Sequence, residues 1–281
     1  MADDEVGRGS FGYVVSPPPV AGAARCRRDL VGKVFFAPEE DAVAEAARAR
    51  ALARRPGGDR HVLGPVPGPL LRRVPGSHPR VIWRGRPVLV MERMPATLCA
   101  ARRFPGAVVW ETLGHLAWLH AAGHAHLDVK AENVLCRLRP DGVAVPGSSR
   151  LIDFGLTRRL EDVRGRRDVR CGYAIYPPEV LRDWGLVTAR TFPRTFGVHD
   201  APGADAATNW RPRGRYAFAG GDRVDVWSWG VMWAELLPRV AEADRDVVRK
   251  CVRAALTLRA AARPSAADLL RTYAPGSPSA M

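Results

Sequence analysis

The chain has 281 residues, enough for one large domain with a substantial buried core. Its hydrophobic share of 47% and charged share of 26% are ordinary for a folded globular protein, which excludes disorder of the whole chain. The formal charge of +14 suggests nucleic-acid binding, but no helix-turn-helix, zinc-finger or aromatic-plus-basic pattern accompanies it. We therefore do not expect direct binding of nucleic acid.

Lysine and asparagine are rare in this chain. The lysines are Lys33, Lys130 and Lys250, and the asparagines are Asn133 and Asn209. The excess of arginine, alanine, glycine and proline is typical of a GC-rich coding sequence. Since two of the lysines and one asparagine fall inside the motifs described below, their retention against this bias is informative.

The cysteines and the apolar stretches bear on the compartment. Five cysteines form no C-x-x-C pair and no metal-ligand spacing, which favours a reducing environment. The longest uncharged stretch, 9–24, contains three consecutive prolines and is not a membrane span. No cationic-then-apolar signal segment opens the chain. We expect a soluble, intracellular protein without a membrane partner.

The N-terminal third is predicted to be rich in β-structure. A glycine-rich turn at 7–12 opens a β-region that extends over 5–36. Pro38 and three acidic residues then begin a helix that runs to about residue 55, where a Pro-Gly-Gly sequence stops it. A long Pro/Gly loop occupies 56–79. The predicted strands are 13–15, 30–36, 81–83 and 87–91.

Helical periodicity dominates from residue 107 onward. Val109, Leu113, Leu116 and His120 recur at helical spacing, and Gly123 ends that segment. Further predicted elements are short strands at 133–138 and 150–153 and helices at 224–237, 244–258 and 265–272. The fold class is therefore α+β, with a small β-rich part followed by a larger helical part.

Residues 7–14 form the string G-R-G-S-F-G-Y-V, a G-x-G-x-x-G-x-V pattern. Glycines let the backbone approach phosphate oxygens and offer N–H groups with no side chain in the way. An ordinary β-turn explains the string equally well when it is taken alone. Because a strand rather than a helix follows, the string does not fit a dinucleotide-binding βαβ unit.

Lys33 lies on the second strand after this turn, where its ammonium group suits contact with phosphates. A carboxylate from the following helix should hold it. Glu45 and Glu40 both qualify, because each shares a helical face with small apolar residues. Glu40 lies in the first turn, where interaction with the helix dipole explains it. We therefore favour Glu45 and keep Glu40 as the alternative.

Residues 126–133 form the string H-L-D-V-K-A-E-N. In it Asp128 can orient a hydroxyl group or accept its proton, Lys130 can neutralise a moving phosphoryl group, and Asn133 can bind a metal ion. The spacing of five from Asp128 to Asn133 is the spacing of a kinase catalytic loop. The string is specific, whereas a polar turn after a helix is the structural alternative.

The string D-F-G at 153–155 closes the predicted strand that contains Leu151. A carboxylate at the end of a strand can bridge Mg²⁺ to nucleotide phosphates, while Phe154 packs beneath it. Such a string is common by chance. Its order and spacing relative to the other motifs make Asp153 a candidate metal ligand.

Together these strings resemble the eukaryotic-type protein kinases over nearly the whole chain. Residues 176–179 are similar to the A-P-E element, 225–230 to D-x-W-S-x-G, and 263–265 to the terminal arginine segment. The resemblance implies a bilobal fold with an N-lobe at about 1–94 and a C-lobe at about 95–281. It also implies ATP and Mg²⁺ as cofactors, protein substrates, and a structural pairing of Arg263 with Glu179.

The resemblance further implies a set of site residues. Adenine would lie near Val14 and Gly32 and bond the backbone of Glu92 and Met94, with Met91 as the gatekeeper. Lys130 indicates the serine/threonine class. The implied ATP-binding residues are Val6, Gly7, Arg8, Gly9, Ser10, Phe11, Gly12, Tyr13, Val14, Gly32, Lys33, Met91, Glu92 and Met94. The implied catalytic residues are Lys33, Glu45, Asp128, Lys130 and Asn133, and the implied metal ligands are Asn133 and Asp153.

Leu127 stands where the family's H-R-D element has an arginine, so the usual receptor of an activation-loop phosphate is missing. Between Asp153 and Glu179 the only hydroxyl groups belong to Thr157, Tyr173 and Tyr176. We predict that activity does not depend on activation-loop phosphorylation. An inserted segment at about 182–222 suggests atypical substrate docking.

A narrower resemblance is to the conserved herpesvirus protein kinases. It depends on the H-L-D-V-K string, the Leu-Arg pair at 138–139, the Pro-Pro-Glu string at 177–179 and the insertion that follows it. It implies a virion-associated enzyme that acts on viral and host proteins, partly in the host nucleus. The arginine-rich segment 158–170 suggests acidic substrates. The alternatives are a pseudokinase scaffold, which would not need the retained Lys33 and Asp128, and a small-molecule kinase, which would lack the A-P-E-like and D-x-W-S-x-G elements.

Overall fold

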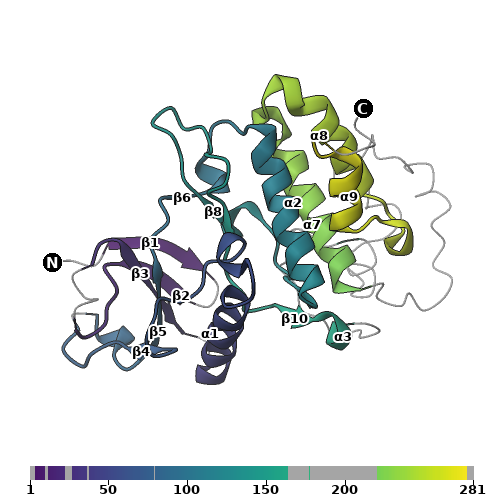
Figure 1. Ribbon diagram of the computed structural model, residues 1–281. Helices are drawn as coiled ribbons and strands as arrows, with labels where there is room; N and C mark the ends of the chain where they lie inside the picture. Colours follow the sequence, from purple (N-terminus) through teal and green to yellow (C-terminus); the bar gives the residue numbers. More distant parts are fainter. Residues whose placement is uncertain are drawn as a thin grey trace, which may run out of the picture. The chain divides into compact units, whose positions relative to one another are not determined.

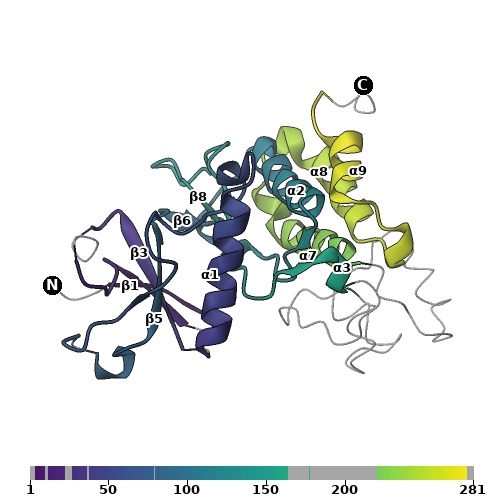
Figure 2. The same ribbon diagram turned by 60° about the horizontal axis from the view of Figure 1, so that its bottom comes forward.

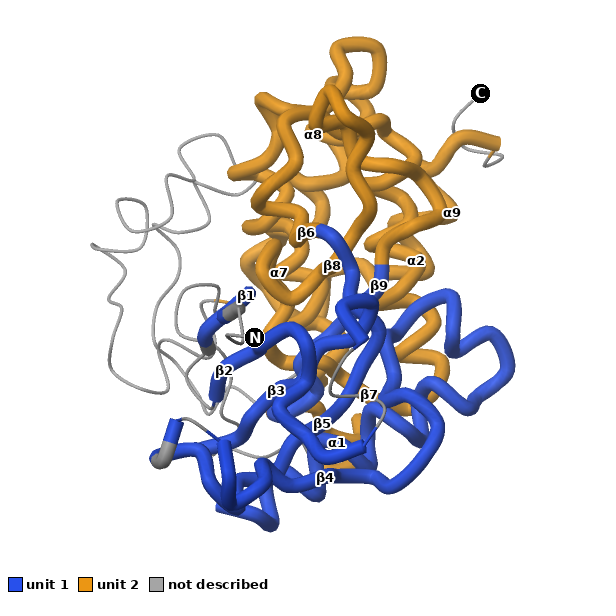
Figure 3. The backbone as a smooth tube through the Cα atoms, turned by 90° about the vertical axis from the view of Figure 1, so that its left-hand side faces the viewer, with its two compact units in different colours: residues 1–95, 150–155 blue, residues 96–149, 156–281 orange. Residues whose placement is uncertain are grey.

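The structure, a computed structural model, divides the chain into two compact units (Figure 3). The first unit comprises residues 1–95 and 150–155, and the second comprises 96–149 and 156–281. The residues that the structure describes are 4–9, 12–22, 27–36, 38–78, 80–163, 177 and 220–276. The predicted insertion at 182–222 lies almost entirely outside these ranges.

A five-stranded antiparallel sheet forms the body of the first unit (Figure 1). Its strand order is β1-β2-β3-β5-β4. Val14 pairs with Lys33, and Lys33 in turn pairs with Leu89, so these three side chains share one face of the sheet. The strands are β1 (Asp4–Gly9), β2 (Gly12–Ser16), β3 (Leu30–Phe35), β4 (Arg72–Arg73) and β5 (Pro87–Glu92).

The opposite face of the sheet carries an apolar core. Because side chains alternate along a strand, the neighbours of Val14, Lys33 and Leu89 point to this other side. The buried cluster there consists of Val15, Val20, Leu30, Val34, Val74, Trp83, Val88 and Val90. The face that carries Lys33 also holds the buried apolar side chains of Val31, Leu89 and Met91, so Lys33 stands among apolar neighbours on that side.

Helix α1 (Glu39–Ala53) lies alongside this sheet (Figure 2). It begins after Pro38, and its acidic first turn suits the positive end of the helix dipole. Its inward face is built from Ala42, Ala46, Ala49 and Leu52, which are all buried. Small side chains allow a close approach of helix and sheet, so the expected helix forms with the face that sequence periodicity requires.

Two local predictions in this unit were wrong. Residues 81–83, expected as a strand, form the 3₁₀ helix η3 (Val81–Trp83), in which the Trp83 N–H bonds the Arg80 carbonyl at 2.9 Å. The ring of Trp83 is buried and stacks on His78, whereas Ile82 is 72% exposed. The packing of Trp83 therefore determines the backbone conformation of this segment. The short strand β4 was not predicted. Another 3₁₀ turn in this unit is η2 (Gly58–Arg60).

The second unit is mainly helical (Figure 1). Helix α2 packs against α7 and α9, and α8 packs against both α7 and α9. Trp229 and Trp233 both donate their indole N–H to the Thr112 hydroxyl, at 3.0 and 2.9 Å, which ties α7 to α2. The helices are α2 (Gly106–Ala121), α3 (Leu160–Val163), α7 (Gly221–Leu236), α8 (Glu242–Ala255) and α9 (Ala266–Tyr273).

Short elements complete the described chain. The strands are β6 (Ala96–Thr97), β7 (His124–Ala125), β8 (Val134–Cys136), β9 (Arg150–Leu151) and β10 (Arg158–Arg159). The 3₁₀ helices are η4 (Leu98–Ala100), η5 (Ala131–Asn133), η6 (Leu237–Arg239) and η7 (Ala260–Ala262). The mixed fold class, with a sheet-rich N-terminal part and a helical C-terminal part, is confirmed. Among the described helices, none combines the length and apolar character needed to cross a membrane.

Candidate active site

Lys33 on β3 is held by two carboxylates of the first unit. Its Nζ lies 2.6 Å from Oε1 of Glu45 on α1 and 3.1 Å from Oδ1 of Asp153. Glu45 is only 4% exposed, whereas Glu40 faces solvent in the first turn of the helix. Of the two glutamates weighed from the sequence, Glu45 is therefore the one beside the lysine. Three motif residues far apart in the sequence meet at one point.

The electrostatics of this cluster keep Lys33 charged. Burial lowers the pKa of Lys33, but Asp153 and Glu45 together outweigh this effect, so the net direction is upward. For Glu45 burial is the largest influence and raises its pKa, while the Lys33 ammonium opposes the shift. The cluster thus favours the protonated ammonium form of a largely buried Lys33 and holds it between two carboxylates.

Asp153 occupies an unusual backbone conformation. Its φ of 64° lies in the left-handed region, which residues other than glycine rarely adopt and which is stabilised here by the surrounding contacts. Phe154 is buried, and a Cβ placed on Gly155 would lie 3.1 Å from Oε2 of Glu45. A larger residue at this position would require the Glu45 carboxylate to move by a few tenths of an ångström.

The carboxylate of Asp153 fits a magnesium ligand. Its side chain is 30% exposed, and carboxylate and amide oxygens are the hard ligands that Mg²⁺ prefers. The described residues contain no group of three or more histidine, cysteine or acidic side chains that could hold a metal ion. Mg²⁺ is usually bound by one or two protein carboxylates together with waters and substrate phosphates.

A second polar cluster lies in the loop before β8 in the second unit. Oδ2 of Asp128 accepts hydrogen bonds from Lys130 Nζ and from Asn133 Nδ2, both at 2.8 Å. Asn133 Nδ2 also donates to the Asp128 carbonyl at 2.8 Å, which leaves its amide oxygen for other uses. The other carboxylate oxygen, Oδ1 of Asp128, is buried and has no hydrogen-bond partner among the residues that the structure describes.

Helix α7 fixes the backbone of this loop. Asp225, fully buried, accepts hydrogen bonds from the N–H groups of His126 and Leu127, both at 2.7 Å, and lies 2.9 Å from Nε2 of His120. Leu127 has a φ of 65°, which is unfavourable for a bulky side chain. The paired hydrogen bonds to Asp225 hold this strained turn, so the D-x-W-S-x-G string positions Asp128 from a distance.

The predicted nucleotide-binding strands require one revision. A Cβ on Gly32 would lie 2.9 Å from both Pro19 and Val88, so Gly32 faces the packed side of the sheet, away from the side chain of Lys33. Val31, which pairs with Met91, shares the face of Lys33 instead. The family resemblance implied Gly32 at this place, whereas strand alternation puts Val31 there.

The glycine-rich turn is described only in part. Ser10 and Phe11 lie outside the described residues, and Val6, Gly7, Arg8 and Gly9 belong to β1. A Cβ on Gly12 would lie 2.0 Å from the Val34 carbonyl oxygen, so the close approach of β2 and β3 alone requires this glycine. At the other end of the predicted site Met91 is buried, Glu92 is exposed and Met94 is half-buried.

Arg263 in the second unit was predicted to have a structural role. Arg263 is buried, donates to the carbonyls of Thr257 at 3.0 Å and Arg223 at 2.7 Å, and lies over the ring of Trp227. Its predicted partner Glu179 falls outside the described residues.

Arg48, which contacts the D-F-G backbone, was not predicted from the sequence. Its spacing of one helical turn from Glu45 was the available signal.

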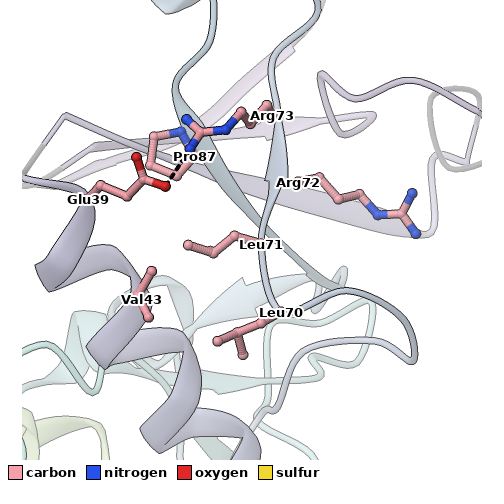
Figure 4. A pocket seen from close by; sticks show the side chains of 7 residues that line it. All are labelled: Glu39, Val43, Leu70, Leu71, Arg72, Arg73 and Pro87. Carbon is pink, nitrogen blue, oxygen red and sulfur yellow. Dashed lines mark hydrogen bonds and ion pairs between the residues drawn. The ribbon is translucent and has the colours of Figure 1, made fainter.

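A separate hollow of about 260 Å³ lies on the surface of the first unit (Figure 4). Glu39 and Arg73, which form an ion pair, contribute to its wall. None of the polar site residues described above lines this hollow. The full lining is Glu39, Val43, Leu70, Leu71, Arg72, Arg73 and Pro87.

No model of a known protein family matches the chain. The serine/threonine-protein kinase mos of Patiria pectinifera is 31% identical over 166 residues, covering 55% of this chain and 42% of that protein. The serine/threonine-protein kinase cst-1 of Caenorhabditis elegans is 36% identical over 95 residues, covering 31% and 18%. The kinase STE20 of Saccharomyces cerevisiae is 26% identical over 133 residues, covering 47% and 10%. The chain thus spans less than half the length of each of these relatives, and its similarity is to serine/threonine protein kinases of the eukaryotic type.

Proposed function

We propose that this chain is an ATP-dependent protein kinase that phosphorylates serine or threonine in protein substrates. The observation that carries the proposal is the asymmetric environment of the Asp128 carboxylate. One oxygen is fixed by Lys130 and Asn133, and the other is buried and unpartnered among the described residues. An unsatisfied buried acceptor costs free energy, about 1–3 kcal/mol, and a substrate hydroxyl would satisfy it.

The reaction forms one bond and breaks one. The substrate hydroxyl donates its hydrogen bond to Oδ1 of Asp128, and its oxygen attacks the γ-phosphorus of ATP. The bond from that phosphorus to the bridging oxygen breaks, ADP leaves, and the hydroxyl proton passes to Asp128 and then to solvent. Lys130, which is partly exposed, neutralises charge on the transferred group.

Lys33 and Asp153 serve the nucleotide in this proposal. The buried ammonium of Lys33 is a point charge for phosphate oxygens, held in place by Glu45. Asp153 and the amide oxygen of Asn133 are the proposed ligands of Mg²⁺, which when bound neutralises negative charge on the phosphates. Each residue thus binds or orients a different part of the reacting groups.

The adenine site is proposed on the Lys33 face of the sheet. Val14, Val31 and Met91 share that face with Lys33 and offer apolar surface for a purine ring. The backbone of Glu92 and Met94 would bond the ring edge. Val31 replaces Gly32 here because of the strand alternation described above.

The test of the proposal is transfer of labelled γ-phosphate to a degenerate peptide library that contains serine, threonine and tyrosine. We expect Asp128→Asn to lower kcat by about a hundredfold to ten-thousandfold, the range for loss of a general base. Lys33→Met should also abolish most transfer. The matched controls, Asp246→Asn and Lys250→Met, change exposed residues of α8 and should retain activity.

The outcomes separate this proposal from a pseudokinase scaffold. Label on serine or threonine that is lost only in the Asp128 and Lys33 variants supports the kinase. Equal label in all variants would contradict the mechanism. ATP binding without transfer by the wild type would favour the scaffold.

We also propose that activity does not need phosphorylation of the activation loop. Leu127 is 2% exposed, so an apolar side chain fills the position of the usual phosphate-binding arginine. Thr157 is fully buried and donates to the His126 carbonyl at 3.4 Å, which makes its hydroxyl inaccessible to a kinase. The remaining candidates, Tyr173 and Tyr176, lie outside the described residues.

Phosphatase-treated protein that carries Tyr173→Phe and Tyr176→Phe tests this independence. We expect its kcat/KM to stay within about threefold of the wild-type value. A change of that size corresponds to well under 1.4 kcal/mol in transition-state stabilisation. Loss of nearly all activity after phosphatase treatment alone would refute the proposal.

We also propose that the chain is related to the conserved herpesvirus protein kinases. It is supported by H-L-D-V-K at 126–130 and by the position of the inserted segment. Complementation of a herpesvirus that lacks its conserved kinase, by this chain and not by the Asp128→Asn variant, is the expected result. Failure of the active wild type to complement would remove the viral assignment and leave the kinase proposal intact.

A further inference from the structure

Helix α1 carries a second side chain that reaches the D-F-G segment. Arg48 lies three residues after Glu45, on the neighbouring turn of the helix. Its Nε donates to the Phe154 carbonyl oxygen at 2.9 Å, and its Nη2 donates to the Gly155 carbonyl oxygen at 2.9 Å. The guanidinium fork thus spans two successive peptide groups of the segment that follows Asp153.

This segment is one that needs to be held. Asp153 has a φ of 64°, a conformation that a non-glycine residue keeps only when its surroundings impose it. Lys33 holds the Asp153 side chain, and Arg48 holds the backbone immediately after it. Glu45 in turn holds Lys33. The contacts that hold the side chain of Asp153 and the backbone after it therefore both depend on one turn of α1, through Glu45 and Arg48.

The packing of Gly155 shows how closely this segment follows α1. A Cβ at this position would lie 3.1 Å from Oε2 of Glu45 and 3.4 Å from Oδ1 of Asp153. The Gly155 backbone therefore lies close to the Glu45 carboxylate, with the Asp153 carboxylate at ordinary contact distance. The two hydrogen bonds from Arg48 therefore hold the backbone of Phe154 and Gly155 close to α1.

We infer that Arg48 is a positioning residue that locks the D-F-G backbone against α1, so that Asp153 stays beside Lys33 without a phosphate on the chain. The inference rests on the proposed kinase function for its catalytic consequence. A guanidinium group is always charged and presents its donors in a rigid fork, so the lock is present whenever α1 is folded. This supplies a physical cause for the proposed independence of activation-loop phosphorylation.

Arg50 provides a matched control on the same helix. Its Nη2 donates to the Gly68 carbonyl at 3.0 Å on the exposed surface, a bond of similar length that touches no site residue. Arg50→Ala removes the same atoms from α1 as Arg48→Ala. A difference between the two variants therefore reports the contact with the D-F-G segment and not the loss of an arginine from the helix.

The first measurement is amide hydrogen exchange of a peptide that covers residues 151–155. We expect faster exchange in Arg48→Ala, an intermediate rate in Arg48→Lys, and the wild-type rate in Arg50→Ala. Wild-type exchange in Arg48→Ala would overturn the inference. If Arg48→Ala does not fold, Arg48→Gln, which keeps one amide NH₂ group as donor, is compared with Arg50→Gln. Faster exchange in Arg48→Gln alone supports the inference, and the wild-type rate in Arg48→Gln overturns it.

The second measurement is the split between kcat and KM in phosphate transfer. We expect Arg48→Ala to lower kcat by about a hundredfold, as expected when a reacting group is misplaced, with little change in KM for the protein substrate. Unchanged kcat in a folded Arg48→Ala protein would overturn the catalytic consequence while the kinase proposal stands. If wild type and Asp128→Asn are equally inactive, the kinase proposal fails, and hydrogen exchange still decides whether Arg48 locks the segment.

Discussion

Lys33 is a buried cation whose charge depends on its two carboxylate neighbours. Burial by itself lowers the pKa of Lys33, and Asp153 and Glu45 reverse that direction. Glu45→Gln removes one of these charges while leaving the burial in place, so the pKa of Lys33 should fall. At mildly alkaline pH a larger fraction of Lys33 is then the neutral, nucleophilic amine. We expect its acylation by a small reagent to rise several-fold, measured by mass spectrometry of the labelled peptide.

The exposed Lys250 serves as the internal reference for this labelling. Its rate of acylation should be the same in wild type and variant. Equal labelling of Lys33 in both proteins would show that Glu45 contributes no electrostatic stabilisation to the ammonium group.

Asp225 is the residue on which the geometry of the loop that carries Asp128 depends. It satisfies two backbone donors next to the strained Leu127. Asp225→Asn replaces one accepting oxygen with a donor, so a buried N–H group loses its partner, at a cost of about 1–3 kcal/mol in the free energy of unfolding. Chemical denaturation measures this loss. The exposed Asp246→Asn should change the free energy of unfolding by less than about 0.5 kcal/mol, as surface substitutions usually do.

Individual site residues could be predicted from the sequence where they belong to short sequence motifs. Lys33, Asp128, Asn133 and Asp153 were chosen because their neighbours and spacing identify them. Arg48 was missed because its partners are backbone carbonyls more than a hundred residues away, and its spacing of one helical turn from Glu45 was the available local signal. Gly32 was taken from the family resemblance, and the pairing of β3 with β5 puts Val31 on the Lys33 face instead.

Helix α1 positions the site as a single element because its inward face is built from alanine. Ala46 is fully buried next to Glu45, whereas Ala47 is exposed. Ala46→Leu should overpack the space under the helix, costing about 1–3 kcal/mol in the free energy of unfolding, and should displace Glu45 from Lys33. Thermal unfolding and phosphate transfer measure the two effects. Ala47→Leu adds the same atoms on the outer face and should leave both nearly unchanged; equal effects of the two variants would contradict the model of a close-packed alanine face.

Secondary-structure elements were predictable where periodicity is long and uniform. The helices at 107–123, 224–237, 244–258 and 265–272 were found because their apolar residues recur over several turns. The error at 81–83 has the opposite cause, since three apolar residues fit a strand or a 3₁₀ turn equally well. The burial of Trp83 against His78, a tertiary contact, decides between them.

The net charge is the property of the whole molecule that most affects its partners. With a formal charge of +14, the chain attracts acidic proteins and should repel basic ones. Two of the arginines, Arg158 and Arg159, are exposed on β10 shortly after the D-F-G string, where Arg159 also pairs with Glu161 at 3.0 Å. Substrates with acidic residues beside the acceptor hydroxyl are therefore expected to bind better than neutral ones.

Salt dependence tests this expectation, because screening shortens the range of the attraction from about 30 Å at 0.01 M to about 8 Å at 0.15 M ionic strength. Across that range KM for an acidic peptide should rise several-fold with kcat unchanged, and KM for a neutral peptide should stay constant. Arg158→Glu with Arg159→Glu should weaken binding of the acidic peptide. The exposed pair Arg253→Glu and Arg259→Glu alters the net charge equally elsewhere on the second unit. If both pairs weaken binding to the same extent, the preference comes from the overall charge and not from the segment that follows Asp153.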